Sequence, residues 1–198
     1  MPASAAVPSD MEATDTELMT RLAAGDDLAL NALMARWRDR VAAFLYRMTR
    51  HSDTAADLAQ ETFVKLYQAR NRYRPEGKFS TYLFAIAANL GRNHARWKRR
   101  HPTVSLDDDS DSKSLLAEAV NPGQTPEEAA TSAEGLRAVH SAFQALPDDL
   151  RVTMSLFIYE GMSYAEIASI VGCSPKAAET RIYRARQFLK EKLKDIRA

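Results

Sequence analysis

The 198-residue sequence contains a single cysteine, Cys173, and only seven glycines and eight prolines. One cysteine excludes an intrachain disulfide and is typical of a protein that works in a reducing compartment. The N-terminal segment MPASAAVPSDMEA lacks a basic stretch followed by an apolar one, and no apolar run approaches ~18 residues. We therefore expect a cytoplasmic protein without membrane insertion.

The sequence also lacks a cluster typical of catalysis or metal binding. Its four histidines are scattered, at His51, His94, His101 and His140. No histidine lies near Cys173 in sequence, which favours a packing role over a nucleophile. The acidic run at residues 107–111 could suggest a metal site, but no further ligand spacing follows it. We expect no metal, no cofactor and no enzymatic activity.

Charge is segregated along the chain, although the formal net charge is only +1. Residues 92–100, RNHARWKRR, are basic without an acid. Residues 106–134 are acidic, with Lys113 as their only base, and residues 176–197 are basic again. Two basic blocks separated by an acidic tract predict two contacts with a polyanion, and they favour nucleic acid.

Apolar periodicity predicts a bundle of about four helices over residues 14–101. Thr14 and Glu17 form a capping box for the first helix, and an apolar stripe over residues 30–48 marks the second. The third helix should run from Asp53 to about Tyr73, and the fourth from Ser80 to about Arg100. In the fourth, the candidate inward residues are Tyr82 or Leu83, Ile86, Leu90 and Trp97.

The rest of the chain predicts a linker and a second helical domain. Residues 101–124 are rich in Asp and Ser without a sustained period, whereas Thr125, Pro126 and Glu128 mark a strong helix start. The apolar face of that helix should be formed by Leu136, Val139, Phe143 and Leu146. The sequence thus predicts an all-α protein in two helical domains: a disordered tail (1–13), a first domain (14–101), a linker (102–124) and a second domain (125–198).

Residues 56–67, ADLAQETFVKLY, carry two separate helical faces. Ala59, Thr62, Phe63 and Leu66 should face a core. Asp57, Gln60 and Glu61 lie at i, i+3 and i+4 and form a second stripe. Periodicity alone leaves two interpretations open, a solvated face or a docking site for another protein.

Residues 161–189 predict a helix-turn-helix motif. Ser163 and Glu166 cap a short first helix, and Gly172 permits the positive-φ position that ends it. Ser174 then caps a longer helix with Pro175 at its first position. The inward face of that helix is Ala178, Ile182, Ala185 and Leu189. Its opposite face would meet a DNA groove with Lys176, Thr180, Tyr183, Arg184 and Gln187, flanked by Arg181 and Arg186.

The two domains together resemble the sigma factors of bacterial RNA polymerase, in particular the small ECF (extracytoplasmic function) group. DLAQETF, residues 57–63, is similar to the D-x-x-Q-E-x-F signature of the sigma-2 domain. Residues 79–100, FSTYLFAIAANLGRNHARWKRR, resemble its promoter-melting segment. The C-terminal helix-turn-helix with RIYRAR resembles the sigma-4 domain. The likeness spans nearly the whole chain except the first dozen residues and the linker.

This resemblance implies a function for each segment. Asp57, Gln60 and Glu61 would bind the clamp helices of the largest subunit of core RNA polymerase, and the polymerase flap is a further expected contact. The −10 promoter DNA would be bound by Lys78, Phe79, Ser80, Thr81, Tyr82, Asn89, Arg92, Asn93 and Arg96. The −35 DNA would be bound by Lys176, Thr180, Arg181 and Arg184. A cognate anti-sigma factor is the expected inhibitor.

Aromatic residues in the −10 segment have two possible roles. The rings of Phe79 and Tyr82 could stack on bases. Tyr82, Phe84 and Trp97 could equally belong to the core.

Three positions depart from the sigma pattern. Tyr82 replaces the common Trp, and Glu179 stands at a position where many members carry a basic residue, Lys or Arg. Gly91 lies inside the basic helix at a cost of roughly 1 kcal/mol, which a bend or close approach of DNA could explain. A stand-alone helix-turn-helix regulator and a metal-dependent hydrolase are the rival functions. The first leaves the stripe of residues 57–61 unexplained, and the second lacks a ligand cluster.

Overall fold

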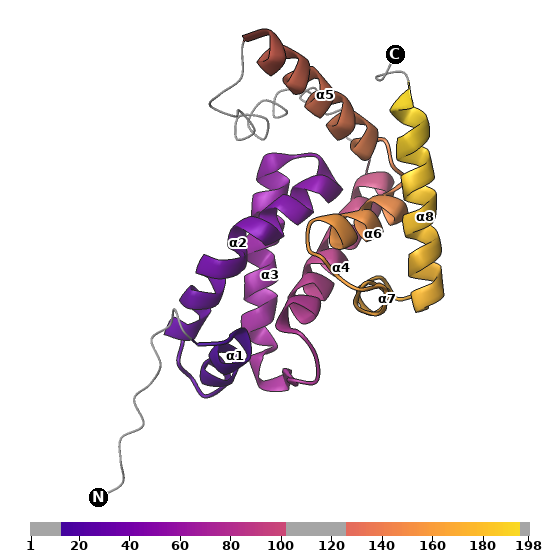
Figure 1. The fold of residues 1–198 in the computed structure, drawn as a ribbon. Helices are drawn as coiled ribbons and strands as arrows, with labels where there is room; N and C mark the ends of the chain where they lie inside the picture. The colour runs from indigo at the N-terminus through magenta and orange to yellow at the C-terminus, as the bar shows by residue number, and fades with distance from the viewer. Residues whose placement is uncertain (1–12, 102–125, 195–198) are drawn as a thin grey trace, which may run out of the picture.

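The computed structural model describes residues 13–101 and 126–194, which we call the N-terminal half and the C-terminal half. Both halves are built from α-helices (Figure 1), which confirms the expected all-α class. Most of the predicted tail, the linker at 102–124 and Thr125 lie outside the described residues.

The N-terminal half contains α1 (Asp15–Ala23), α2 (Leu28–Thr49), α3 (Ser52–Gln68) and α4 (Phe79–Arg100). The predicted capping box of α1 is confirmed, since Thr14 Oγ1 accepts from the Glu17 N–H and the Glu17 carboxylate accepts from the Thr14 N–H. Helix α3 ends five residues earlier than Tyr73, because the chain tightens into a 3-10 turn at Arg70–Arg72.

The C-terminal half contains α5 (Pro126–Gln144), α6 (Asp148–Ile158), α7 (Tyr164–Val171) and α8 (Pro175–Lys192). The predicted inward face of α5 is half right. Phe143 and Leu146, which lies just past the end of the helix, are buried, but Leu136 and Val139 are 40% and 50% exposed. Figure 1 gives the reason, because α5 projects away from the other helices and approaches α8 at its C-terminal end.

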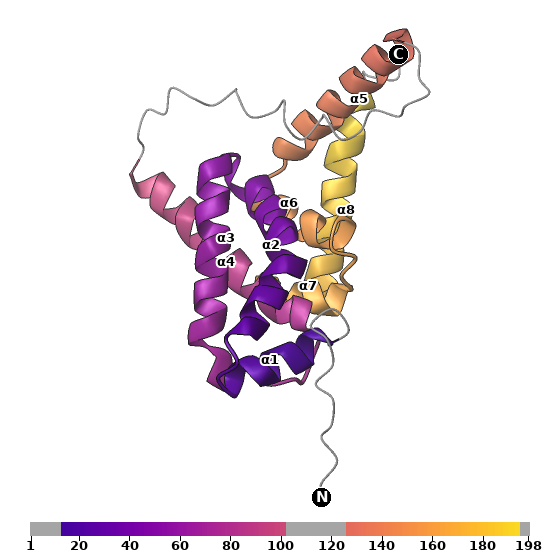
Figure 2. The ribbon, with the colours of Figure 1, turned by 90° about the vertical axis from the view of Figure 1, so that its left-hand side faces the viewer.

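Helix α4 buries one continuous face formed by Phe79, Leu83, Phe84, Ala87, Ala88 and Gly91. Of the two alternatives Tyr82 and Leu83, Leu83 is the buried one, and Ile86 and Leu90 are half-buried. The prediction of an inward Trp97 is wrong, since this side chain is 54% exposed. The last turns of α4 extend past the other described helices (Figure 2), so the apolar periodicity continues beyond the helices that cover the rest of α4.

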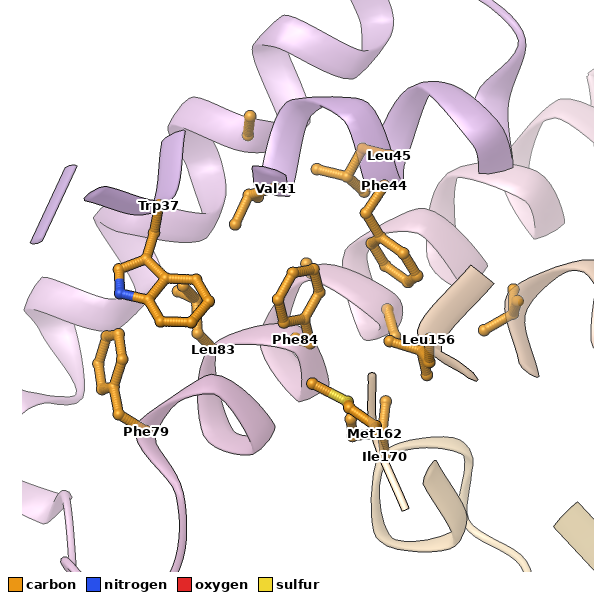
Figure 3. Close-up of a cluster of buried hydrophobic side chains, with 14 of the residues drawn as sticks. Trp37, Val41, Phe44, Leu45, Phe79, Leu83, Phe84, Leu156, Met162 and Ile170 are labelled. Carbon is orange, nitrogen blue, oxygen red and sulfur yellow. The ribbon is translucent and has the colours of Figure 1, made fainter. Parts of the chain in front are cut away.

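The two halves share one hydrophobic core. Helix α4 packs along α7, and α2 packs along α6. Figure 3 shows Leu156, Met162 and Ile170 of the C-terminal half pointing toward Phe44 and Phe84 of the N-terminal half. The core therefore fixes how the candidate sites of the two halves lie relative to each other.

Candidate nucleic-acid interface

Helix α3 presents the predicted stripe to solvent. Its N-cap is His51, whose Nδ1 accepts from the Thr54 N–H at 3.4 Å. The face with Ala59, Thr62, Phe63 and Leu66 is buried against α2 and α4, as predicted. Side chains on the other face are exposed, and we call Asp57, Gln60 and Glu61 the α3 stripe. The stripe is therefore accessible to a partner, but its docking role stays a prediction.

The segment that begins α4 is less open than the sequence predicts. Lys78 is exposed, yet its Nζ lies 3.0 Å from the Glu166 carboxylate of the C-terminal half. Phe79 is 4% exposed and packs edge-on against Trp37 at 5.8 Å between ring centroids. The expected stacking role of Phe79 is therefore wrong for this structure, because its ring is part of the core.

The remaining residues of this segment are half-buried: Ser80, Thr81 and Tyr82. Tyr82 packs against Tyr73 at 5.2 Å, and burial raises the pKa of the Tyr82 hydroxyl, with a smaller contribution from Tyr73. Thr81 Oγ1 is buried without a hydrogen-bond partner. Tyr82 is thus only partly accessible, and its ring is not free.

Two arginine–amide pairs follow each other along α4. Arg92 donates to Asn89 Oδ1, and Arg96 donates to Asn93 Oδ1 at 3.0 Å. Asn89, Asn93 and Arg96 are exposed, whereas Arg92 is half-buried and also donates to the Ile170 carbonyl at 3.2 Å. Burial lowers the pKa of Arg92, and the like charges of Arg96 and Arg181 lower it further. These groups can hold a nucleic-acid backbone and read base edges.

Trp97 extends this surface and is absent from the predicted contacts. Its ring stacks on His101 at 5.1 Å and lies 6.2 Å from the ring of His94. Burial lowers the pKa of His94, followed by the charges of Lys98 and His51. The sequence carried a signal, because Trp97 is the aromatic residue within the basic block RNHARWKRR.

The C-terminal half contains the predicted helix-turn-helix. Ser163 Oγ accepts from the Glu166 N–H at 3.3 Å, and Glu166 accepts in return from the Ser163 N–H at 2.8 Å. Gly172 ends α7 with φ of 72°, and Ser174 caps α8 by accepting from the Ala177 N–H. All four local predictions for this motif are confirmed, including Pro175 at the first position of α8.

Helix α8 divides into the faces that its sequence predicts. Ala178, Ile182 and Ala185 are buried, whereas Tyr183 and Arg184 are exposed. The first turn is internally bonded: Lys176 Nζ lies 2.7 Å from Glu179, and Thr180 Oγ1 donates to the Lys176 carbonyl. Glu179 therefore neutralises the lysine at the start of the candidate reading face.

Arg181 lies on the flank of α8 that faces the N-terminal half. It is half-buried, 3.8 Å from Asp149, and lines a cleft of about 510 Å³ between the halves. We call this the interdomain cleft. Its charged lining comes from both halves and comprises Arg92, Arg96, Arg99, Asp148, Asp149, Arg151 and Arg181. One predicted −35 residue and two predicted −10 residues thus meet in one cavity.

Residues 13–101 and 126–194 bring together no group of three or more His, Cys, Asp or Glu that could hold a metal ion. Over the same ranges, every helix is too short or too polar to cross a membrane.

Comparisons with known proteins match both halves. The pattern described as Sigma-70 region 2 matches residues 33–101, and Sigma-70, region 4 matches residues 136–189. The chain is 31% identical to an RNA polymerase sigma-H factor of Pseudomonas aeruginosa, over 92% of this chain and 95% of that protein. It is 32% identical to an ECF RNA polymerase sigma-E factor of Haemophilus influenzae, over 92% and 97%.

Two solved structures have a similar arrangement. The structure of CnrH in complex with the cytosolic domain of CnrY matches with a TM-score of 0.64 and 27% identity, over 90% of this chain and 96% of CnrH. The sigma factor RpoE of Bartonella quintana, in complex with the anti-sigma factor NepR, matches with a TM-score of 0.59 over 83% and 96%. Its 20% identity makes this second match evidence of fold alone.

Proposed function

Because the chain belongs to the ECF group of RNA polymerase sigma factors, we propose that it docks on core polymerase through the α3 stripe and carries two DNA-reading surfaces to the promoter. The family acts in transcription initiation, and we extend this to a protein that works in the cytoplasm and does no catalysis of its own. The observation that carries the docking role is the α3 stripe itself. Asp57, Gln60 and Glu61 are all exposed on a helix whose opposite face is core.

The −10 surface in this proposal is formed by the start and the polar face of α4. Lys78 and Arg92 hold the backbone of the strand, while Asn89 and Asn93 meet base edges, supported by Arg96. Ser80, Thr81 and the accessible part of Tyr82 line the place of a flipped base. Phe79 is left out, because its ring is buried.

The −35 surface is the exposed face of α8. Lys176, Thr180 and Arg184 contact the major groove, with Glu179 close enough to accept from a cytosine amino group. Arg181 contributes only when it is released from Asp149. We also propose the division into a sigma-2-like domain (14–101), a linker (102–124) and a sigma-4-like domain (125–198), supported by the two family matches.

The proposed partner that holds the protein inactive is an anti-sigma factor. CnrH, which is 27% identical, was solved with the cytosolic domain of CnrY. Exposed apolar side chains on the C-terminal half offer such a partner a binding surface, among them Val139, Ile158 and Tyr159.

Run-off transcription with core polymerase on genomic promoter fragments tests the function. We expect promoter-dependent transcripts from the wild-type chain. Glu61→Lys should lose both polymerase binding and transcription and keep binding to isolated DNA. The matched control is Asp53→Lys, a charge reversal on α3 that lies outside the α3 stripe. It should leave polymerase docking unchanged. Wild-type protein that binds duplex DNA tightly alone, but yields no promoter-dependent transcript, would point to a stand-alone regulator instead.

A further inference from the structure

The interdomain cleft carries more positive charge than its own carboxylates balance. Five of its lining residues are arginines and two are aspartates, so three positive charges are in excess. Asp148 serves two of the arginines, since its carboxylate lies 3.6 Å from Arg99 and also accepts from Arg151. Asp149 lies 3.8 Å from Arg181. Both acids of the cleft are therefore already engaged.

Arg92 and Arg96 line the cleft without a carboxylate of their own in the described parts of the chain. Arg92 donates to Asn89 Oδ1 and to the Ile170 carbonyl, and Arg96 donates to Asn93 Oδ1. Burial lowers the pKa of Arg92, and the charges of neighbouring arginines lower it further. An anion in the cleft would relieve this repulsion, whereas a neutral ligand would not.

Arg151 fixes one wall of the cleft before any ligand arrives. Its side chain is only 4% exposed, and its guanidinium donates to the carbonyls of Gln144 and Leu146. Among the described residues, Arg151 Nε is buried and has no hydrogen-bond partner. A cation that is held in this way loses little conformational freedom when it meets an anion.

A second cavity adjoins the cleft and extends the positive surface along α4. It has a volume of about 370 Å³ and shares Met48, Arg99, Asp148 and Arg151 with the cleft. Its additional charged or titratable lining residues are Arg50, His94 and Lys98. The excess of positive charge is therefore not confined to one pair of arginines.

The cleft has the size and the lining of a small-molecule site. Its volume of about 510 Å³ lies within the range of roughly 300–1,000 Å³ that is typical of ligand pockets. Met48, Val152 and Val171 add apolar surface beside the arginines. The walls come from α4 on one side and from α6 and α8 on the other, which suits a compact anion better than an extended strand.

The excess charge indicates how many phosphate groups such a ligand carries. One phosphate monoester carries about −1.5 to −2 charges at pH 7, so two phosphate groups are needed to balance an excess of three. Guanidinium groups bind phosphate oxygens in pairs, which favours arginine over lysine at a phosphate site.

We propose that the interdomain cleft binds a small molecule with a diphosphate group, either free pyrophosphate or a nucleoside diphosphate. Arg92 and Arg151 hold its inner phosphate, and Arg96, Arg99 and Arg181 hold the outer one. The site itself does not depend on the proposed function. Its consequence does, because Arg92 and Arg96 cannot bind a diphosphate and promoter DNA at the same time.

Isothermal titration calorimetry on the full chain tests the site without polymerase, promoter or magnesium. We expect inorganic pyrophosphate to bind once per chain and at least about tenfold more tightly than inorganic phosphate, because it engages a second set of arginines. ADP distinguishes the two sources of the group. Binding of ADP as tight as that of pyrophosphate, or tighter, identifies a nucleoside diphosphate, and weaker binding identifies free pyrophosphate.

Arg96→Gln with Arg181→Gln should weaken pyrophosphate binding about tenfold or more. The matched control is Arg38→Gln with Lys190→Gln, which removes the same charge from exposed positions of α2 and α8 outside the cleft. This control should stay within about twofold of the wild type. Circular dichroism verifies that both double variants are folded.

Asp149→Asn should act in the opposite direction and tighten pyrophosphate binding roughly threefold, because it frees Arg181 for the ligand. Glu191→Gln is its control, since Glu191 is an exposed acid on α8 that pairs with Lys194 away from the cleft. It should leave the affinity unchanged.

Equal affinity for phosphate and pyrophosphate, or equal losses in the two double variants, would overturn the proposal in favour of general attraction of anions. A single-stranded oligonucleotide that depends on Arg96 and Arg181, together with no binding of pyrophosphate, would make the cleft a nucleic-acid surface instead. Loss of promoter-dependent transcription with pyrophosphate binding as expected would reject the proposed function and leave the diphosphate site standing.

Discussion

Gly91 of α4 lies so close to Met48 of α2 that a Cβ at position 91 would come within 2.6 Å of Met48 Cε and 2.9 Å of Met48 Sδ. This contact explains a glycine in the middle of a basic helix. The sequence alone suggested a bend or the approach of DNA, but the structure shows the neighbouring helix at this position.

Gly91→Leu should lower the free energy of unfolding by about 1–3 kcal/mol, because the larger side chain overpacks the contact with α2. Gly91→Ala should change it by less than about 1 kcal/mol, since the gain in helix propensity offsets the displacement of the flexible Met48 end. Urea unfolding followed by circular dichroism measures both.

Gly135→Ala is the control for the Gly91 substitutions, because no atom lies within 4 Å of a Cβ placed at Gly135 in α5. Gly135→Ala should raise the free energy of unfolding by up to about 1 kcal/mol. Adding Met48→Ala should restore part of the stability lost in Gly91→Leu. A Gly91→Leu protein as stable as the wild type would disprove the contact.

Local features of the sequence predicted most of the helices. Caps such as Thr14 with Glu17 and Ser163 with Glu166 depend only on residues three apart, so they can be seen without the fold. The faces of α3 and α8 were predicted for the same reason, because a helical period identifies one side of one helix. These local predictions placed the α3 stripe and the outer face of α8 correctly in space.

The sequence predictions are wrong where a second helix determines whether a side chain is buried. Val139 and Trp97 continue an apolar period, but none of the described helices covers them, and both side chains are exposed. Phe79 looked like a free ring and is buried against Trp37. The ion pairs of Glu160 with Arg40 and Arg47 could not be predicted at all, since the carboxylate and the two arginines lie more than one hundred residues apart in sequence.

The pH dependence of stability should report the capping box of α7. Hydrogen bonds from Ser163, through its hydroxyl and its N–H, together with the nearby Lys78, lower the pKa of Glu166 to about 2 from a usual 4.5. A carboxylate with a lowered folded-state pKa stabilises the fold above pH 4.5 and loses this contribution as the pH falls toward 2.

Glu166→Ala should therefore lower the free energy of unfolding by about 1 kcal/mol at pH 7, which is the usual contribution of a helix cap. The difference in unfolding free energy between this variant and the wild type should shrink as the pH falls from 4.5 to 2. Thermal unfolding across this range measures it. Glu17→Ala in the α1 box is a companion variant, because hydrogen bonds from Thr14 also lower the pKa of Glu17. A difference that stays constant down to pH 3 would show that the charge of Glu166 is not responsible.

Arg184→Ala should weaken initiation at promoters that depend on a −35 element by roughly tenfold, within the ~1–3 kcal/mol of one good base contact. Arg184 is exposed on the outer face of α8, so its removal should leave stability unchanged. Transcription on matched templates with and without the −35 element measures the effect. Lys190→Ala removes the same charge two turns further along and should have little effect; equal losses from both would indicate nonspecific attraction only.

Trp97→Ala should impair promoter opening and leave the fold intact. The Trp97 side chain is 54% exposed and contacts His94 on its own helix and His101 at the C-cap of that helix, so its loss should change the free energy of unfolding by no more than about 0.5 kcal/mol. Stacking of an unpaired base on an aromatic ring is worth about 1–3 kcal/mol, which predicts a loss of open complex of about tenfold. Permanganate reactivity of unpaired thymines measures the open fraction directly. Trp97→Phe keeps an aromatic face and should retain most of it. A template with a preformed bubble should restore Trp97→Ala to near wild-type transcription, because the strand is already separated; an equal defect on that template would place Trp97 in docking rather than in strand opening.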